Sequence, residues 1–322
     1  MEPPTETTTK SLRDRLAYRA LIATAPITSP RRLSAWWEHA WETRTMRMTG
    51  ATTVTVHGYP LQMNCGYAYP AFYRRWPQYT APLARLVNAT ASLLDRRVTV
   101  VDVGAADGDT AALILERCRR DVHRIVCVEP DAEFYPYLAA NFGGRGDIDT
   151  HQVMLSDRIG QAATLVRTHS GTASAQGDAL RQTTTLDVLL AQRGCDVLKV
   201  DTDGFDGRIL AGATGLLRAC RPTVMFEGHP VAYSATGNDY AQPFRELVRS
   251  GYRWFVFFTK EGDFSQVRDG LDQPGVDRLA ALCLSGRGPR PDWHYDVAAL
   301  RDDDHPNPLV VAGTTHPGRE TT

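Results

Sequence analysis

The middle of the chain alternates short apolar segments with longer segments in which apolar residues recur at helical spacing. We predict the apolar segments to be strands, and they cover residues 98–104, 123–129, 148–155, 195–201, 222–228 and 252–258. The segments between them predict helices at about 109–119, 132–141, 185–193, 205–218 and 240–250. Apolar strands that alternate with helices are typical of a doubly wound, mostly parallel α/β sheet. Ligands of such sheets bind beyond the carboxyl ends of the strands, so the residues that follow each strand are the candidates for function.

The residues before this core predict a helical extension. Apolar residues recur at helical spacing over 11–48, and another helix is predicted at about 82–95. Between them, residues 52–64 can form a hairpin, and the aromatic and proline-rich residues 65–79 form either an irregular cover or a lid over an acceptor. We assign residues 1–96 to this N-terminal extension.

The core domain is assigned to residues 97–265 and a C-terminal segment to residues 266–322. In the C-terminal segment, residues 291–300 combine aromatic and ionisable side chains, and we expect them to dock on the sheet or to close over the acceptor. The residues from 301 onward are polar and rich in proline, which predicts a frayed tail.

Composition narrows the classes of partner. The 322 residues carry a formal net charge of −1 and are 43% hydrophobic, which suits a globular protein with a buried core. A chain without an overall positive charge is not expected to bind nucleic acid or an anionic membrane surface. The six cysteines show no zinc-ligand spacing, and the polar N-terminus shows no apolar signal segment. We therefore expect a cytoplasmic protein with free thiols.

The turn after the first predicted strand is rich in glycine and aspartate. Asp102 and Gly104 are followed by Asp107, Gly108 and Asp109. Glycines let the backbone approach a ligand closely, but the G-x-x-x-G spacing and the negative charge disfavour a pyrophosphate. The turn therefore favours a ligand that carries positive charge or hydroxyl groups. The alternative is a tight turn in which Asp109 caps the next helix.

An acidic residue, Glu129, ends the second predicted strand. It follows the first turn by roughly 20 residues, as in sites where a carboxylate accepts hydrogen bonds from both ribose hydroxyls of a nucleoside. The two motifs together indicate a nucleoside cofactor without a leading phosphate. S-adenosylmethionine fits, because it has a ribose, an adenine and a sulfonium cation but no phosphate. A nicotinamide dinucleotide would also use Glu129, but the acidic turn disfavours it.

The fourth and fifth predicted strands end in ionisable residues. Because side chains alternate along a strand, Lys199, Asp201 and Asp203 are expected on one side, and Glu227 and His229 likewise share a side. These groups meet at the carboxyl edge of the sheet if the two strands are neighbours. Lys199 lies in an apolar strand, so we expect it to pair with a carboxylate.

These groups are our catalytic candidates: Asp201, Asp203, Glu227 and His229. His229 is the candidate general base, because imidazole titrates near neutral pH, and Glu227 or Asp203 could orient it; a purely structural histidine is the alternative. The carboxylates could also bind sugar hydroxyls or attract a cationic aminosugar. The glycine spacing excludes an EF-hand, and a single divalent ion held by all four groups is an alternative that we do not favour.

Six motifs follow one another along the core: VVDVGAADGDT, VEPD, LSD with Gly160 close behind, TTTLD, LKVDTDGFDGRILAGA and PTVMFEGH. Their succession resembles the FkbM-type family of class I S-adenosylmethionine-dependent methyltransferases over roughly residues 98–258. The resemblance implies a Rossmann-like class I methyltransferase fold. Two sites depart from the family pattern. Ala106 and Asp107 stand in the first turn in place of the usual asparagine, and residues 202–204 read Thr-Asp-Gly instead of Val-Glu-Gly.

The resemblance also implies roles for matching positions. It places Asp102 and Gly104 at the methionine part of the cofactor and Glu129 at the ribose. The positions implied at the adenine are Pro130, Asp131, Ser156 and Asp157. For Ser156 and Asp157 an ordinary polar loop is the alternative. Three further residues complete the cofactor-binding candidates: Asp107, Gly108 and Asp201.

The residues and the resemblance together predict an S-adenosylmethionine-dependent O- or N-methyltransferase. The expected acceptor is a polar small molecule, a sugar or aminosugar of a secondary metabolite such as an antibiotic. No nucleic acid or membrane is expected as a partner, and the oligomeric state is left open. The alternatives are a nicotinamide-dependent oxidoreductase and a non-catalytic nucleoside-binding module of the same fold.

Overall fold

The computed structural model describes the chain at residues 6–25, 37, 40–41, 43–45, 48, 50–76, 78–160, 162–163, 166–169, 172–174, 181–191, 193–285, 294–302 and 304–314. Parts of the predicted helical stretch 11–48 and of segment 291–300 lie outside the described residues. Among the helices that the structure describes, none is long and apolar enough to cross a membrane.

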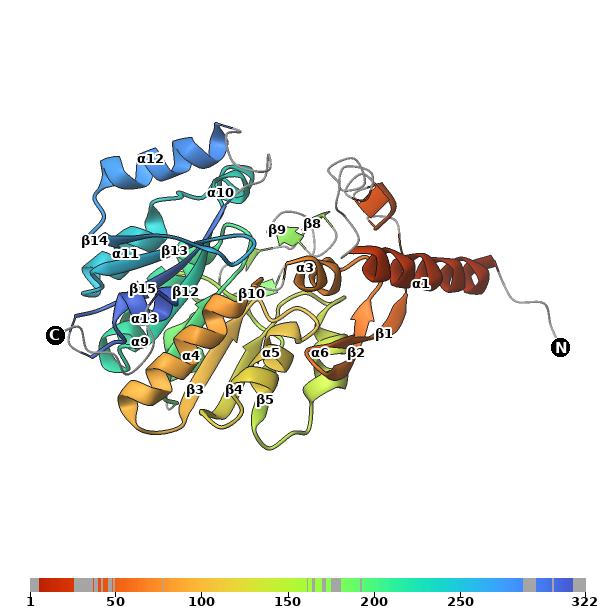
Figure 1. Cartoon of the computed structure of the whole chain (residues 1–322), viewed down its shortest axis with the longest axis horizontal. Coiled ribbons are helices and arrows are strands. Elements are labelled where there is room, and N and C mark those ends of the chain that lie inside the picture. The colour runs from red at the N-terminus through yellow and green to blue at the C-terminus, as the bar shows by residue number, and fades with distance from the viewer. Residues whose placement is uncertain are drawn as a thin grey trace.

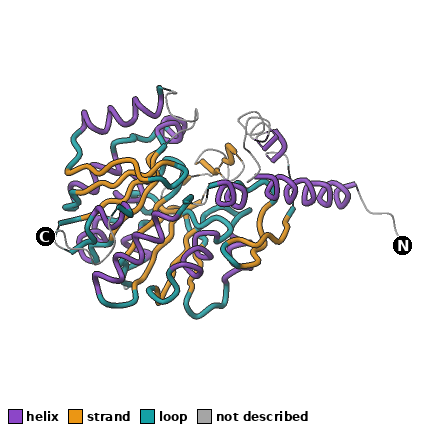
Figure 2. The backbone as a smooth tube through the Cα atoms, viewed as in Figure 1, coloured by secondary structure: helices purple, strands orange, loops and turns teal. Residues whose placement is uncertain are grey.

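A sheet of eight strands forms the core, and helices cover both of its faces (Figure 1, Figure 2). The strand order is β14-β13-β15-β12-β11-β3-β4-β5. Five neighbouring strands are parallel: β12 (Thr223–Gly228), β11 (Val197–Val200), β3 (Val98–Val103), β4 (Val122–Val128) and β5 (Ile148–His151). The sheet continues beyond β12 through antiparallel pairs with β15 (Tyr295–Leu300), β13 (Trp254–Thr259) and β14 (Phe264–Asp269). The predicted doubly wound, mostly parallel sheet is confirmed.

The central strands are apolar because both faces of the sheet are buried. Alternate residues of a strand point to opposite faces, so Val98 and Val100 of β3 join one hydrophobic cluster and Val101 and Val103 join the other. Helices α4 (Ala81–Leu94) and α5 (Asp109–Arg117) contribute to the first cluster. The second cluster includes α8 (Asp206–Ala211), α9 (Thr214–Ala219) and α11 (Gln242–Arg249).

Two predicted elements are divided in the structure. Residues 148–155 form β5 and then β6 (Met154–Leu155), which pairs with β10 (Arg181–Thr184) outside the main sheet. The predicted helix 205–218 is divided into α8 and α9 around Gly212. A Cβ atom on Gly212 would lie 2.2 Å from the carbonyl oxygen of Ser156, so the chain needs a glycine at this close approach.

Several elements were not predicted. They are α10 (Pro230–Thr236), α12 (Gln273–Leu284), α13 (Pro308–Ala312) and the strands β14 and β15. Helix α13 shows that the prediction of a frayed tail from residue 301 was wrong at this point. Its Val311 and Ala312 are buried, and it packs against α4, so apolar burial orders this part of the tail. The remaining short elements are α6 (Tyr135–Phe142), α7 (Leu186–Leu189), β7 (Ala162–Ala163), β8 (Val166–His169) and β9 (Thr172–Ser174).

The N-terminal extension lies, except for its last helix α4, at the end of the molecule away from α12 (Figure 1). It contains α1 (Glu6–Thr24) and the predicted hairpin, which is formed by β1 (Ala51–Val56) and β2 (Tyr59–Asn64). Helix α3 (Tyr69–Arg75) occupies part of the segment that the prolines predicted to be irregular. Pro70 lies in the first turn of α3, where a helix tolerates proline because no hydrogen bond is lost.

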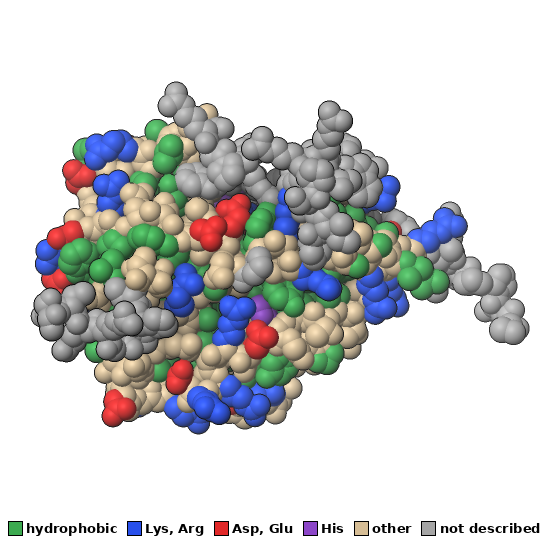
Figure 3. All heavy atoms as spheres, in the orientation of Figure 1, with side chains coloured by type: hydrophobic (Ala, Val, Ile, Leu, Met, Phe, Trp, Pro, Cys, Tyr) green, Lys and Arg blue, Asp and Glu red, His purple; other side chains and the backbone are tan. Residues whose placement is uncertain are grey.

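Charged side chains of both signs occur across the face seen in Figure 3. Many form ion pairs, such as Arg124 with Asp149 at 2.7 Å and Arg253 with Asp302 at 2.9 Å. Exposed pairs of this kind contribute little to stability, about 0–1 kcal/mol each. The charges that bear on function are instead gathered at the carboxyl edge of the sheet.

Gly104 brings the end of β3 against the end of β11. Its φ angle is +82°, and a Cβ atom there would lie only 1.9 Å from the carbonyl oxygen of Asp201. A side chain at this position would therefore push the two strand ends apart. The close approach explains the glycine of the first motif without any reference to a ligand.

We predict that Gly104→Ala lowers the free energy of unfolding by at least about 3 kcal/mol, because it adds a backbone clash to the strain of a positive φ. Gly144→Ala is the matched control. Gly144 has a φ of +84°, and nothing lies within 4 Å of its added Cβ. It should lose only about 1 kcal/mol. Urea denaturation measures both values, and equal losses would contradict the close approach at Gly104.

Candidate functional site

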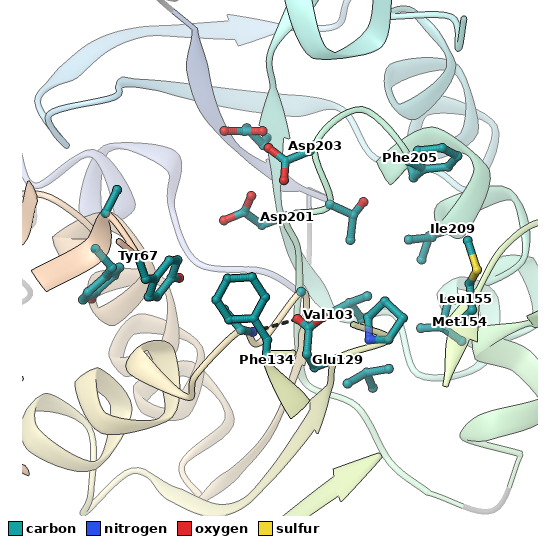
Figure 4. Close-up of a pocket in the computed structure, with 18 of the residues that line it drawn as sticks. Tyr67, Val103, Glu129, Phe134, Met154, Leu155, Asp201, Asp203, Phe205 and Ile209 are labelled. Carbon is teal, nitrogen blue, oxygen red and sulfur yellow. Dashed lines mark hydrogen bonds between the residues drawn. The ribbon is translucent and has the colours of Figure 1, made fainter. Parts of the chain in front are cut away.

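A pocket of about 200 Å³ opens at the carboxyl edge of the sheet (Figure 4). Residues that follow β3, β4 and β11 line it, together with β6 and the end of β12. Six of the predicted site residues are in its wall: Gly104, Glu129, Pro130, Asp201, Asp203 and Glu227. The other predicted site residues lie around the wall and not in it: Asp102, Asp107, Gly108, Asp131, Ser156, Asp157 and His229.

A buried ion pair joins the two central strands beneath the pocket. Lys199 lies opposite Asp102 in the β11–β3 register, and its Nζ donates a hydrogen bond to Oδ1 of Asp102 at 2.9 Å. Asp102 is fully buried and Lys199 is 9% exposed. Nζ also lies 3.4 Å from Oδ2 of Asp201. Burial alone would lower the pKa of Lys199, but Asp102 and Asp201 raise it well above its ordinary value. Lys199 therefore pairs with a carboxylate, as predicted.

The acidic turn after β3 is tied to the N-terminal extension. Oδ2 of Asp107 accepts a hydrogen bond from the backbone N–H of Asn64 at 2.9 Å. The hydroxyl of Tyr67 donates to Asp109 at 3.3 Å. Gly108 precedes α5 with a φ of +93°, and a Cβ there would lie 2.5 Å from the ring of Phe142. Asp107 thus ties the turn to the hairpin, and Gly108 lets the turn pack closely against α6.

Glu129 fixes one end of the pocket. Oε2 accepts a hydrogen bond from the N–H of Ala106 and Oε1 from the N–H of Asp131, both at 2.8 Å. The residue is 6% exposed, and burial raises its pKa to about 7 even though both N–H groups favour the ionised form. Pro130 lines the pocket beside it, and Oδ1 of Asp131 accepts from the N–H of Glu133 at 2.6 Å.

An apolar wall lies next to Glu129. It is formed by Val153, Met154, Leu155, Phe205 and Ile209. The predicted polar residues lie just behind this wall: Ser156 donates to Oδ1 of Asp157 at 2.9 Å, and Arg208 binds the same carboxylate at 2.7 Å. Their assignment to an adenine stays a prediction.

Carboxylates gather at the other end of the pocket. Asp201 lies between Asp203 and Glu129 in the view of Figure 4. Asp203 has a φ of +51°, which aspartate tolerates better than most residues, and this turn directs the chain into α8. Burial and the charges of Glu227 and Asp201 raise the pKa of Asp203 well above its ordinary value. Asp206 is fully buried behind this end and accepts a hydrogen bond from the N–H of Glu227 at 3.2 Å.

The sequence did not identify His294, which pairs with Glu227 of the pocket wall. Its Nε2 lies 3.0 Å from Oε1 of Glu227, and its ring stacks on His229 with centroids 4.3 Å apart. Burial would raise the pKa of Glu227, but His294 lowers it below its ordinary range. In turn, Glu227 raises the pKa of His294 despite burial and the charge of Lys260, which both lower it. The pair is therefore a buried ion pair.

Several residues of the pocket wall were not predicted from the sequence. Tyr67, Tyr69, Phe72 and Tyr79 come from the aromatic segment of the extension, Phe134 from the loop before α6, and Lys260 from the β13–β14 turn. The many aromatic side chains in residues 65–79 were the sequence feature that could have identified this part of the wall. These residues line the pocket, so the segment lies where either a cover or an acceptor-binding lid would act.

Within the part of the chain that the structure describes, no group of three or more histidine, cysteine, aspartate or glutamate side chains could hold a metal ion.

Segment 291–300 reaches the site in a way the sequence did not predict. Its residues 295–300 form β15, which is inserted between β12 and β13. In that register Tyr295 lies opposite Gly228, which brings His294 next to His229.

We predict that Lys199→Met lowers the free energy of unfolding by about 3–5 kcal/mol, because it leaves a charge buried at Asp102. The double variant Lys199→Met/Asp102→Asn should lose less than the single variant. Arg96→Met is the control, since Arg96 pairs with Asp196 at 2.6 Å with 52% of its side chain exposed, and it should lose at most about 1 kcal/mol. A double variant that loses the sum of both single losses in urea denaturation would contradict this account.

Comparisons with known proteins identify a related family. Residues 102–254 match the family model described as the methyltransferase FkbM domain. No curated protein matches the chain.

Among solved structures, methyltransferase FkbM from Methylobacillus flagellatus KT is 15% identical with a TM-score of 0.39, and the match covers 63% of this chain and 44% of that one. The precorrin-6y C5,15-methyltransferase of Geobacter metallireducens GS-15 is 11% identical over 67% of this chain and 86% of that one, with a TM-score of 0.35. The ribosomal protein L11 methylase of Lactobacillus delbrueckii subsp. bulgaricus is 11% identical with a TM-score of 0.31, and the match covers 67% of this chain and 77% of that one. These scores are low, so the assignment rests on the family model. Residues 102–254, the core of the sheet and its site, are thus similar to the methyltransferase FkbM domain.

Proposed function

We propose that this methyltransferase uses S-adenosylmethionine and methylates a hydroxyl or amino group of a polar small molecule, a sugar or aminosugar. The observation that carries the proposal is the division of the pocket into two ends. A single buried carboxylate, Glu129, stands beside an apolar wall at one end, and Asp203 and Glu227 stand at the other.

The residues near Glu129 fit a nucleoside. A carboxylate at the end of the second parallel strand suits two ribose hydroxyls, and Met154 and Leu155 offer an apolar surface to a purine. The turn at Gly104 leaves backbone exposed to the pocket, and its acidic surroundings suit a cation better than a phosphate. When bound, S-adenosylmethionine supplies a methyl group on a positively charged sulfur. Asp102 and Gly104 would lie toward its methionine part and Glu129 toward its ribose.

The remaining residues act on the acceptor. Asp203 and Glu227 can accept hydrogen bonds from its hydroxyl or amino groups and thereby orient them. Asp201 lies between the two ends, and 45% of its side chain is exposed in the cleft. Partial removal of bulk water within the cleft and the charge of Glu227 raise the pKa of Asp201, although Lys199 opposes the shift, so Asp201 is suited to take up the proton of an acceptor hydroxyl. His229 is the second candidate for this role; it lies behind the wall and is stacked on His294.

A nicotinamide-dependent oxidoreductase is the competing function that Glu129 also fits. The first turn disfavours it, because Asp107 and Asp109 are buried there, at 0% and 3% exposure, where a pyrophosphate would approach. A binding module without activity is distinguished only by a transfer assay.

We predict that the chain binds S-adenosylmethionine and not NAD, and that Glu129→Gln weakens this binding by about tenfold to a hundredfold, since hydrogen bonds to a charged group contribute about 1.5–3 kcal/mol. Calorimetry measures both ligands. Glu133→Gln, an exposed glutamate in the same loop, is the matched control and should bind normally. Tight binding of NAD, or normal binding by Glu129→Gln, would contradict the proposal. Labelled methyl transfer to a panel of hydroxylated and aminated glycosides tests activity itself.

The affinity for S-adenosylmethionine should depend on pH. Burial raises the pKa of Glu129 to about 7 in the free protein, and the ribose hydroxyls require the ionised carboxylate. The association constant is therefore expected to rise with pH, by at most about tenfold per unit, and to level off above the pKa of Glu129. Burial also raises the pKa of Asp109 to about 7. Asp109→Asn should keep the pH dependence and Glu129→Gln should lose it; the reverse would refute the role of Glu129.

A further inference from the structure

Glu227 lines the pocket, and one oxygen of its carboxylate has no hydrogen-bond partner among the residues that the structure describes. Oε1 is bound by His294 at 3.0 Å, whereas no residue that the structure describes forms a hydrogen bond with Oε2, although this atom is buried. Glu227 as a whole is 9% exposed and lines the pocket. An ionised carboxylate oxygen that is buried without a hydrogen bond is costly, so this atom is suited to a donor supplied by a ligand.

The surroundings of Glu227 carry more acidic than basic groups. Lys199 is held by Asp102 and Asp201, and His294 is held by Glu227. The further ionisable groups that act on this end of the pocket are Asp203, Asp206, Asp296, His229 and Lys260. Burial and mutual repulsion raise the pKa of each of the three aspartates in this set, that of Asp296 to about 7. A bound cation would relieve this repulsion.

This end of the pocket is separate from the nucleoside end. Figure 4 shows Asp203 and Glu129 on opposite sides of Asp201. Lys260 is the cation in the wall at the acidic end, and its Nζ lies 5.6 Å from the ring centroid of Phe72. A positively charged group of a second molecule could therefore reach Asp203 and Glu227 while the Glu129 end is occupied.

We propose that Glu227 and Asp203 form a subsite for a protonated amino group of the acceptor, and that the methyl group goes to a hydroxyl of that acceptor and not to the amine. The inference rests on the proposed methyltransferase function and names its substrate class. Carboxylates stabilise an ammonium group against loss of its proton. An ammonium nitrogen has no lone pair, so it cannot attack a methyl group.

The hydroxyl reaction balances without a further reagent. A lone pair of the hydroxyl oxygen forms the new carbon–oxygen bond as the carbon–sulfur bond breaks, and the electron pair of the broken bond remains on sulfur. The hydroxyl proton passes to the carboxylate of Asp201. Asp203 and Glu227 hold the ammonium group and keep its proton in place throughout.

The test compares aminoglycosides with their N-acetylated derivatives on the full chain saturated with S-adenosylhomocysteine. Calorimetry should show that free amines bind at least about tenfold more tightly than the acetylated forms. Glu227→Gln and Asp203→Asn should each abolish most of this preference. Glu246→Gln is the matched control, because Glu246 pairs with Arg249 on the surface of α11, and it should keep the preference. Normal binding of S-adenosylhomocysteine by each variant shows that it is folded.

The transfer assay uses labelled S-adenosylmethionine with the same compounds, and mass spectrometry locates the methyl group. Methyl groups on oxygen of compounds whose amines stay free support the subsite. No amine preference in binding, or a methylated nitrogen, overturns it. Methyl transfer to neutral glycosides, without tighter binding of free amines, would support the methyltransferase function and contradict the subsite. Amine preference without any transfer would support the subsite and count against the proposed function.

Discussion

The ion pair between Lys199 and Asp102 is the interaction on which the site depends. It joins the central strands β11 and β3 just below their carboxyl ends, in a region where the neighbouring side chains are apolar. A buried charge of this kind is tolerable only with its partner in place. Because Lys199 also approaches Asp201, the pair fixes the point where the two strand ends meet and where Gly104 passes the carbonyl of Asp201. Asp102, to which the resemblance gives a place at the methionine part of the cofactor, is fully buried and also supports the two strand ends.

With Asp102 neutralised, the remaining charge is divided along the pocket. Glu129 is held by two backbone N–H groups at one end, while the carboxylates around Glu227 crowd together at the other. At the first end, the carboxylate of Glu129 is held in a position that suits two hydroxyl groups. At the second end, the carboxylates repel one another, and a cationic ligand would reduce this repulsion. His294 offsets part of this negative charge, because its protonated ring pairs with Glu227. In the function proposed here, the nucleoside and the amine-bearing acceptor occupy these two ends in fixed order, with Asp201 between them.

The core of the fold was predictable because strands buried on both faces are mostly apolar, as in β3 and β12, where every position is buried. Glu129, Asp203 and Glu227 were also predictable as wall residues, since each follows or ends a parallel strand. His294 was not, because it reaches the site only through the insertion of β15 between β12 and β13. Nothing in the residues between Glu227 and His294 indicates that β15 pairs with β12 in this register. Met154 and Leu155 of β6 line the pocket and were not predicted, whereas the assignment of the neighbouring Ser156 and Asp157 to an adenine stays a prediction.

The central claim is that the carboxyl edge of the sheet binds a nucleoside at Glu129 and leaves the acidic end for the acceptor. A crystal structure of the chain with S-adenosylhomocysteine tests it most directly. The account predicts both ribose hydroxyls on the carboxylate of Glu129, the adenine against Met154 and Leu155, and the sulfur directed toward Asp201. A nucleoside bound among Asp203 and Glu227, or outside this pocket, would contradict it.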